Sequence, residues 1–535
     1  MHRGMDEPTG NDNRRPGLWT ALLITAIVRA VTVTLLLTVF WPTSAVSHLV
    51  QDIRTWRDFF AETQAGAIPY VNLTKEYPVL GGILYWLMSP FVRPDDLRQT
   101  IAVHAAFMGI ADLVNAALFH RLAREIAPRW AFAATLALGL NLTAIVTAPV
   151  RYESWITTFV LLGYLAHRRR RFWTAAALWS IGCGLKWYPA FFIAAQEWRL
   201  FVVERRRWHW VGAGAVFAAV TAALNLPFAL LCLRETGSLA NWLAPYVFHV
   251  KRPLYWDTLL GVGQIWLGAL PWERYAGLWS LALMLAAVVV RPRMAIEYKG
   301  VLICLAAVFF NRIYSTQFNL WFYPFLILGM LGDDRSDRRR LAVAFVILDL
   351  LNVLIYPISF AGAVAEMGGF FPGAARAAGR WTVVFSAAIV LRTVVVAVLA
   401  VLVLHCGHQR GGWLRRRGPR VDSGARGGQN QRSPQKRRVD EQGRPDRIAG
   451  SRDGSAGRWQ LQGEVRREPR GARPPERQDA PVPHSRDRGR PRHRRRLALR
   501  PQARPHHLPR QVALALGGPF PSPIIPARRP GWTRC

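Results

Sequence analysis

The chain has 535 residues, 51% of them hydrophobic, and its apolar residues form runs of roughly 15–24 residues separated by short basic clusters. The net charge of +36 at first suggests a nucleic-acid partner, but residues 405–535 hold 31 Arg and one Lys against ten acidic residues. The remaining excess is typical of cytoplasmic loops, so we expect no nucleic-acid partner and predict a multi-spanning protein of the lipid bilayer. The five cysteines show no metal-ligand spacing, and no metal or other cofactor is expected.

Residues 1–17 are polar and are predicted to form a cytoplasmic N-terminus, because Arg14 and Arg15 precede the first apolar run. That run, residues 18–40, is too long for a signal-peptide core, and no convincing cleavage site follows it. It is therefore predicted to be an uncleaved membrane anchor, which places the first extracytoplasmic loop at residues 41–100.

A second apolar segment, residues 79–92, lies within this loop. As a helix its 14 residues would measure about 21 Å, which is shorter than the roughly 30 Å hydrocarbon core. If the segment is re-entrant or interfacial, the later basic clusters all fall on the cytoplasmic side of an all-α bundle of about twelve transmembrane helices with both termini inside. The later spans are predicted near 101–120, 131–149, 152–166, 172–187, 189–203, 208–231, 257–290, 297–311, 317–331, 341–360 and 381–404.

The transmembrane domain is thus predicted to cover residues 18–404. Residues 405–535 are rich in Arg, Pro and Gly and show no hydrophobic periodicity, so we expect no packed core there. Two interpretations of this segment remain open, which are a disordered basic cytoplasmic tail and a sequence translated out of frame.

The outer connections of this topology collect ionisable residues from distant parts of the chain. In chain order these are Asp52, Asp58, Glu76, Arg151, Glu153, Lys186, His249, Lys251, Arg252, Asp257 and Arg312. A membrane enzyme with an extracytoplasmic active site is built in this way, although each charge alone is equally well explained as a solvated loop charge. Within the first loop, residues 56–60 are predicted to form a short amphipathic helix at the membrane interface with aromatic side chains toward lipid.

Several short motifs follow one another along these outer connections. After Asp52 they are Gly66-Ala-Ile-Pro-Tyr70, Glu76-Tyr-Pro78, Arg151-Tyr-Glu153, Lys186-Trp-Tyr-Pro189 and Arg252-Pro, followed by Asp257-Thr258. Their order resembles the GT-C superfamily of integral-membrane glycosyltransferases, and within it glycosyltransferase family 87, over roughly residues 18–360. Two departures are Val79, where a second Pro is usual, and Asp257-Thr258, where Glu-Ser is common.

The resemblance implies a GT-C-like helical bundle in the plasma membrane. It also implies transfer of a sugar, typically mannose, from a polyprenyl-phosphate donor to a lipid-linked or envelope glycan acceptor at the outer face. An arabinofuranosyl donor remains an alternative. From another class, a transporter or lipid flippase could use Asp112 and Asp349 as a proton relay, but interhelical hydrogen bonding is the favoured interpretation of these two residues. A catalytically inactive scaffold is the third possibility.

The residue types suit this chemistry. A donor with a single phosphate can be held by cationic side chains, for which the candidates are Lys186, His249, Lys251, Arg252 and Arg312. A single displacement inverts the anomeric carbon and needs one carboxylate to take the proton of the acceptor hydroxyl. The resemblance implies Asp52 as this base, with Glu76 and Asp58 as runners-up. Contacts to the sugar or the acceptor are expected from Tyr77, Arg151, Glu153, Trp256 and Asp257.

Overall fold

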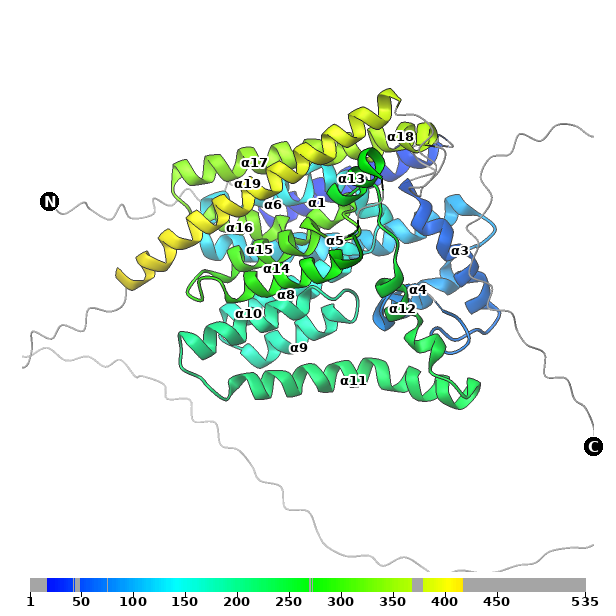
Figure 1. Ribbon diagram of the computed structural model, residues 1–535, viewed down its shortest axis with the longest axis horizontal. Coiled ribbons are helices and arrows are strands. Elements are labelled where there is room, and N and C mark those ends of the chain that lie inside the picture. The colour runs from blue at the N-terminus through cyan, green and yellow to red at the C-terminus, as the bar shows by residue number, and fades with distance from the viewer. Residues whose placement is uncertain are drawn as a thin grey trace, which may run out of the picture. The chain divides into compact units, whose positions relative to one another are not determined.

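The computed structural model describes residues 17–41, 43, 49–74, 76–268, 271, 273–367 and 379–416 (Figure 1). Within these ranges the secondary structure is helical, with a single isolated bridge between Pro69 and Leu73 and no strand. The all-α prediction is therefore confirmed for the described part of the chain. Residues 1–16 of the predicted N-terminal segment 1–17, and residues 417–535, lie outside the described residues. The last helix extends to Arg416, beyond the predicted domain limit at residue 404.

Five helical segments are long and apolar enough to cross a membrane. They are α1 (Leu18–Thr38), α5 (Leu97–Ile126), α11 (His209–Thr236), the Arg335–Met367 segment, and the Arg380–His408 part of α19 (Arg380–Arg416). The Arg335–Met367 segment comprises α17 (Arg335–Val353), a π-helical turn (Leu354–Ser359) and α18 (Phe360–Met367). A sixth candidate is the pair Pro128–Gly139 and Leu142–Val150, which is bent by 46° and contains α6 (Ala131–Gly139) and α7 (Leu142–Thr147).

The remaining apolar helices of the described chain are shorter. They are α8 (Glu153–Arg168), α9 (Phe172–Cys183), α10 (Pro189–Val202), α14 (Ala276–Val289), α15 (Ile296–Phe309) and α16 (Tyr323–Leu331). The longest, α8, has 16 residues and measures about 24 Å, less than a typical hydrocarbon core. The predicted total of about twelve crossings is therefore not confirmed, although most of the predicted segments coincide with helices.

The predicted span 257–290 is wrong in one respect, because it consists of two helices. The first, α13 (Leu259–Leu267), begins at Thr258, whose hydroxyl accepts a hydrogen bond from the backbone N–H of Gly261 at 2.9 Å. It ends at Gly268, whose φ of +79° strains any residue with a Cβ atom. The next α-helix, α14, begins only at Ala276, so residues 257–290 do not form one continuous helical span.

The first outer loop contains α3 (Gln51–Gln64), α4 (Val79–Met88) and a short 3-10 helix (Ser89–Phe91). The aromatic side chains of α3 were expected to face lipid, and this prediction is wrong. Trp56, Phe59 and Phe60 are buried, and Trp56 stacks on Tyr85 of α4 at 3.6 Å between ring centroids. The apolar face of α3 packs against other parts of the protein, and this packing holds the first loop in place.

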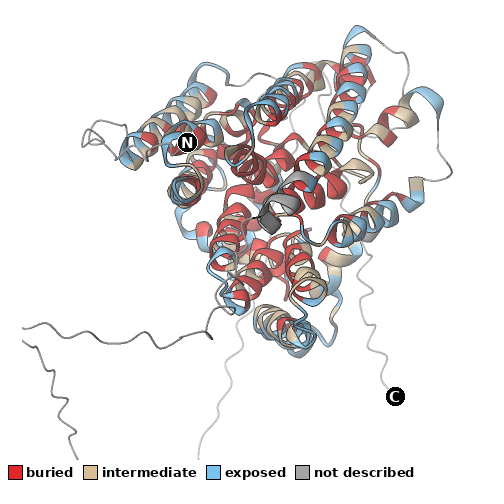
Figure 2. Cartoon of the chain, turned by 90° about the vertical axis from the view of Figure 1, so that its left-hand side faces the viewer, coloured by how far each residue is buried: buried red, intermediate tan, exposed pale blue. Residues whose placement is uncertain are grey.

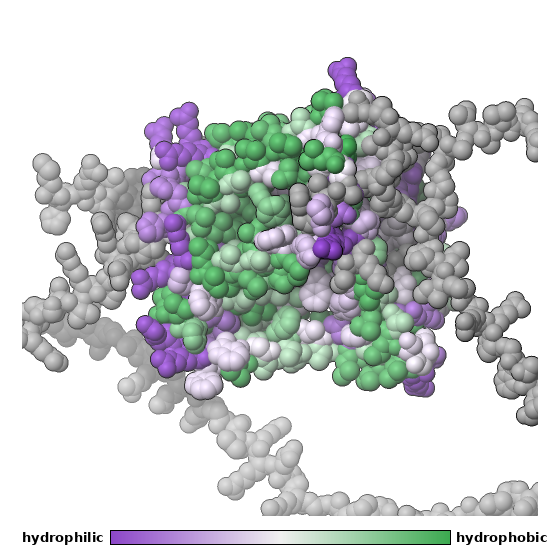
Figure 3. All heavy atoms as spheres, viewed as in Figure 1, coloured by the Kyte–Doolittle hydropathy of each residue, from purple (hydrophilic) through white to green (hydrophobic). Residues whose placement is uncertain are grey.

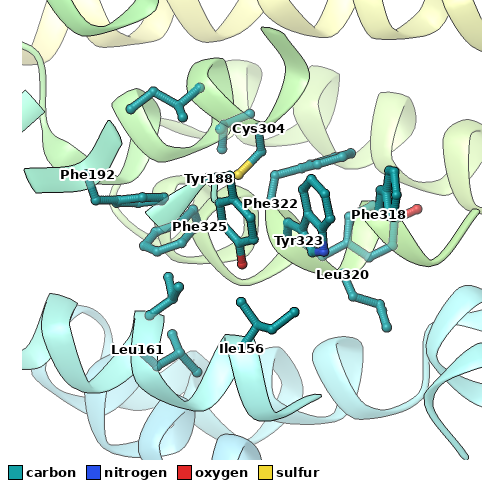
Figure 4. Close-up of a cluster of buried hydrophobic side chains, with 14 of the residues drawn as sticks. Ile156, Leu161, Tyr188, Phe192, Cys304, Phe318, Leu320, Phe322, Tyr323 and Phe325 are labelled. Atoms are coloured by element: carbon teal, nitrogen blue, oxygen red, sulfur yellow. The ribbon is translucent and has the colours of Figure 1, made fainter. Parts of the chain in front are cut away.

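Short helices form the centre of the fold, where buried residues concentrate (Figure 2). α15 and α16 are buried around nearly their whole circumference, as expected for helices that are apolar on all sides. Figure 4 shows how aromatic side chains from α10 and α16 gather in this core; Phe192 and Phe325 lie 5.0 Å apart between ring centroids.

The long helices instead expose apolar side chains on the surface, among them Leu230 and Val401. Figure 3 shows hydrophobic residues across the middle of the face in view and hydrophilic residues gathered along its left edge. Such a surface suits a lipid bilayer. In Figure 1, α3, α4 and α12 (Ala240–Lys251) lie together at the right-hand end of the helices, away from the connection between α10 and α11.

Both carboxylates inside the apolar segments make interhelical hydrogen bonds. Asp349 of α17 accepts from the backbone N–H of Leu142 at 2.6 Å and from the N–H and hydroxyl of Thr143 at 3.0 and 2.6 Å. It therefore caps the start of α7. Asp112 of α5 accepts from Arg29 Nε at 2.9 Å and from the Ser154 hydroxyl at 2.6 Å. These contacts support the interhelical interpretation over a proton relay.

Replacing Asp349 by Ala is expected to destabilise the protein by about 2–4 kcal/mol, because two backbone N–H groups and the hydroxyls of Thr143 and Tyr323 lose their acceptor. Thermal unfolding of the purified protein in detergent measures this loss. The matched control is Asp58→Ala, since Asp58 is exposed on α3. Equal unfolding temperatures for the two variants would show that the cap contributes nothing.

Candidate active site where the outer connections meet

The site is built around the segment Arg151-Tyr152-Glu153, which lies at the start of α8. Glu153 occupies the first turn of α8, and the carbonyl of Ser154 accepts a hydrogen bond from Asn115 Nδ2 of α5 at 2.7 Å. The Arg151 guanidinium forms an ion pair with the Asp52 carboxylate. The Glu153 carboxylate forms an ion pair with Lys186 Nζ at 2.6 Å. One short segment therefore joins an acid and a base from two other parts of the chain.

Asp52 lies in the first turn of α3, where a carboxylate is favoured by the helix dipole. Its side chain keeps 37% of its surface exposed, whereas the side chain of its partner Arg151 keeps only 8%. The carboxylate is thus held from the protein side and remains accessible from the other. This geometry suits a group that exchanges a proton with a substrate.

Lys186 lies in the turn between α9 and α10 and is surrounded by aromatic rings. Its Nζ atom is 5.1 Å from the ring centroid of Tyr152, 4.4 Å from that of Phe318 and 5.0 Å from that of Trp321. Burial lowers the pKa of Lys186, and the Glu153 carboxylate opposes that shift. The Lys186 ammonium therefore forms an ion pair with Glu153 and cation–π contacts with the aromatic rings.

Arg252 follows the last residue of α12. Its guanidinium lies over the rings of Phe248 and Tyr255, at 5.3 and 4.9 Å from the centroids, and its buried Nε has no hydrogen-bond partner among the described residues. Arg312 supports this position, because its Nη1 donates to the carbonyl of Arg252 at 2.7 Å and its Nη2 to the carbonyl of Arg274 at 3.0 Å. Of these two arginines, Arg252 is the better placed to bind an anion.

His249 precedes Arg252 by three residues on α12. Burial lowers the pKa of His249 to about 4, and the charges of Arg252 and Lys186 act in the same direction. At neutral pH this imidazole is uncharged, so it can offer a hydrogen bond to a phosphate but no positive charge. Lys251 forms the end of α12, and its side chain lies outside the described residues.

Tyr77 and Glu76 bring the first loop to the same place. The Tyr77 ring stacks on Trp56 at 5.4 Å and meets Tyr152 edge-on at 4.9 Å. The Glu76 carboxylate is half-buried. Burial alone would lower the pKa of the Arg252 guanidinium. Tyr255 and Glu76 have the larger combined effect, so the pKa is raised. Glu76 and Arg252 therefore interact electrostatically.

The loop that carries these two residues is fixed by Tyr70. The Tyr70 hydroxyl donates to the carbonyls of Tyr77 and Pro78, both at 2.9 Å, and accepts from the Gly82 N–H at 2.9 Å. A Cβ at Gly82 would lie 2.2 Å from this hydroxyl, so the close approach requires glycine. The turn 77–82 is thereby held against the buried Tyr70 ring.

Three predicted site residues take other positions. Asp58 is exposed and lies six positions after Asp52, which places it on another face of α3. Trp256 is buried with Ile355 and Phe385 in a hydrophobic cluster, so its ring offers no open face to a sugar. The Asp257 carboxylate accepts hydrogen bonds from the Tyr314 N–H and the Ser315 hydroxyl, both at 3.3 Å, and burial raises its pKa.

Sequence reasoning missed several residues of this region. Phe318 and Trp321, which face Lys186, lie in a 3-10 helix (Thr316–Trp321), and Tyr356 packs against both the Trp256 cluster and the cluster of Ile53. The sequence contains many aromatic residues, 11% of the chain, so nothing in it distinguishes these three as part of the site. Arg392 of α19, by contrast, is a lone cation in a long apolar run and could have been found.

Among the residues that the structure describes, no group of three or more His, Cys, Asp or Glu side chains could hold a metal ion. No protein-family model matches the chain, and no curated protein matches it. The likeness to GT-C glycosyltransferases therefore remains a proposal that rests on the motifs and on the geometry of this site.

The lowered pKa of His249 predicts a pH-dependent loss of stability. The group has a pKa of about 4 in the folded protein, against an ordinary value of 6.5. Below pH 6.5 the unfolded chain therefore binds a proton that the folded protein does not, and stability falls by up to about 1.4 kcal/mol per pH unit until the folded form also protonates. His249→Gln is expected to reduce the fall in unfolding temperature between pH 7 and pH 5.

Thermal unfolding in detergent at both pH values measures this difference. His408→Gln is the control, because His408 is exposed near the end of α19, and it should leave the pH dependence unchanged. An identical pH dependence in His249→Gln and in the unsubstituted protein would contradict the lowered pKa of His249.

Proposed function

We propose that the protein is an integral-membrane glycosyltransferase. It transfers a sugar, with mannose as the first choice, from a polyprenyl-phosphate donor to a lipid-linked or envelope glycan acceptor, with inversion of the anomeric carbon. In this proposal the protein lies in the plasma membrane with both termini in the cytoplasm and the site on the outer face. The chain would belong to the GT-C superfamily, close to glycosyltransferase family 87.

The observation that carries this proposal is the convergence of four outer connections on one site. Asp52 with Arg151, Glu153 with Lys186, and Arg252 with Glu76 interact across large separations in sequence. Solvated loop charges have no reason to pair in this way, because isolated surface ion pairs contribute little. A set of paired acids and bases, in which Arg151 and Glu153 are buried, beside the Arg252 guanidinium supports chemistry on a phosphorylated lipid.

The reaction assigns one role to each part of the site. Asp52 takes the proton of the acceptor hydroxyl, while the acceptor oxygen forms a bond to the anomeric carbon on the face opposite the donor phosphate. The bond between the anomeric carbon and the phosphate oxygen breaks, and the lipid phosphate leaves with the electron pair. Arg252 stabilises the charge that develops on this leaving group.

The neighbouring residues position the substrates. Arg151 orients the Asp52 carboxylate through the ion pair. The partly exposed ring of Tyr77 suits the apolar face of a sugar, and the buried Tyr152 packs edge-on against it at 4.9 Å between centroids. Glu76 is the alternative base, since it is half-buried in the same region. Asp58 is a weaker candidate because it lies on another face of α3.

The competing proposal of a transporter or flippase has less support. Asp112 and Asp349 would be its proton-carrying groups, and both are occupied by interhelical hydrogen bonds. The polar residues of the site come from loops and helix ends rather than from broken helices in the middle of the apolar segments, where transporters bind their substrates.

Asp52→Asn is expected to lower the rate of sugar transfer by about 10²–10⁴-fold, because the amide cannot take the proton. The assay incubates membranes containing the protein with radiolabelled polyprenyl-phosphate mannose and separates the lipid products. Asp58→Asn is the control and should keep its activity within about twofold. Retained activity in Asp52→Asn together with its loss in Glu76→Gln would reassign the base to Glu76.

The same assay decides the wider function when the unsubstituted protein receives different donors. Transfer from the mannose donor supports the proposal, and transfer only from polyprenyl-phosphate arabinofuranose indicates the arabinosyl alternative. Absence of transfer from both donors to endogenous acceptors would contradict the enzyme and favour the transporter.

The proposed orientation predicts which positions a membrane-impermeant thiol reagent reaches. Asp58→Cys should be labelled in intact cells, whereas Arg207→Cys, exposed in the connection between α10 and α11, should be labelled only after permeabilisation. The native cysteines at 183, 232, 304 and 406 are buried, which limits background labelling, and the unsubstituted chain measures what remains. The reverse labelling pattern would invert the proposed topology.

A further inference from the structure

Arg392 is a fully buried cation within the apolar helix α19. A charge in such a position carries a large desolvation cost unless it is paired or hydrogen-bonded. The residue lies outside the outer connections that supply the rest of the site. Its partners therefore indicate why an arginine is retained in this helix.

Those partners belong to two outer segments. The Arg392 guanidinium donates to the carbonyl of Tyr314 at 3.1 Å and to the carbonyl of Asp257, and it lies 3.7 Å from the centroid of the Tyr314 ring. The Asp257 carboxylate in turn accepts from the Tyr314 N–H and from the Ser315 hydroxyl. Arg392 thus fastens residues 252–258 and residues 311–316 to the same point on α19.

These two segments also support each other directly at the arginine proposed to bind the phosphate. The Tyr255 N–H donates to the carbonyl of Arg312 at 2.8 Å, and the Arg312 guanidinium donates to the carbonyl of Arg252 at 2.7 Å. Tyr255 also holds the Arg252 guanidinium, because Nη2 donates to the Tyr255 hydroxyl at 3.4 Å and the guanidinium lies over the Tyr255 ring. The position of Arg252 therefore depends on the two segments being held together.

We infer that Arg392 is a positioning residue, which clamps segments 252–258 and 311–316 and so sets the place of Arg252 for the donor phosphate. This inference rests on the proposed function. Among the described residues, the hydrogen bonds of Arg392 go to Tyr314 and Asp257, whereas Asp52 and Arg151 belong to α3 and to the start of α8. Loss of the clamp should therefore weaken donor binding much more than the chemical step.

The side chain must be an arginine for a geometric reason. Its planar fork reaches two carbonyls at once and stacks on the Tyr314 ring, whereas a lysine offers one compact charge and no plane. Arg392→Lys should keep part of the clamp, and Arg392→Met should remove all of its polar contacts. Ser315→Ala removes a single hydrogen bond of the same assembly, to Asp257.

The first readout is the kinetics of transfer from polyprenyl-phosphate mannose over a range of donor concentrations. Arg392→Met is expected to raise the donor KM about tenfold with kcat changed less than about threefold, which corresponds to about 1.4 kcal/mol in donor affinity. Arg392→Lys and Ser315→Ala should show smaller increases in KM. Arg380→Met, at an exposed position on the same helix, is the control and should match the unsubstituted protein.

The second readout is amide hydrogen exchange of the purified protein, which needs no activity. Exchange in peptides covering 252–258 and 311–316 should be several-fold faster in Arg392→Met and in Arg392→Lys, while α3 should be unchanged. Unchanged exchange in both segments, or a fall in kcat with an unchanged KM, would overturn the inference. If the unsubstituted protein transfers no sugar, the proposed function fails while hydrogen exchange still decides whether Arg392 acts as the clamp.

Discussion

The candidate site depends on the two ion pairs that leave the segment Arg151-Tyr152-Glu153. The Arg151 and Glu153 side chains are 8% and 1% exposed, so removing Asp52 or Lys186 would leave an uncompensated buried charge, a loss of about 3–5 kcal/mol. Each pair also joins two regions. Asp52 connects the first loop to α8, and Lys186 connects the turn between α9 and α10 to the same helix. These contacts convert three flexible connections into one defined surface.

Hydrophobic patterning predicted the helices well but not their relation to the membrane. The reason is visible in α15 and α16, which are as apolar as membrane spans yet too short, and which are buried among other helices. The hydrophobic pattern of a short apolar segment does not show whether the segment is surrounded by lipid or by protein. The aromatic face of α3 was misjudged for the same reason, because Trp56 and Phe60 pack against the protein instead of the bilayer.

The site was predicted as a set of positions rather than as a set of contacts. Charges in the outer connections identified Asp52, Arg151, Glu153 and Lys186, because polar residues are rare in such a chain and stand out. Which acid meets which base depends on helix packing, so the pairing of Lys186 with Glu153 had no sequence signal. Arg392 is visible in the sequence as a lone cation in an apolar run, but its role is not, because the two backbone carbonyls to which it donates have no sequence signal.

The charge balance of the site indicates that its basic residues have different roles. Asp52, Glu76 and Glu153 balance Arg151, Lys186 and Arg252, and Arg312, Arg392 and Asp257 leave one further positive charge. A sugar phosphodiester carries a single negative charge, but the lipid phosphate released from it approaches two, since its second pKa lies near 6. The charge of Lys186 is already balanced by Glu153 at 2.6 Å, and its Nζ atom lies among aromatic rings. Stabilisation of the leaving group therefore falls to Arg252, whose placement depends on α19 rather than on the helices that hold the base.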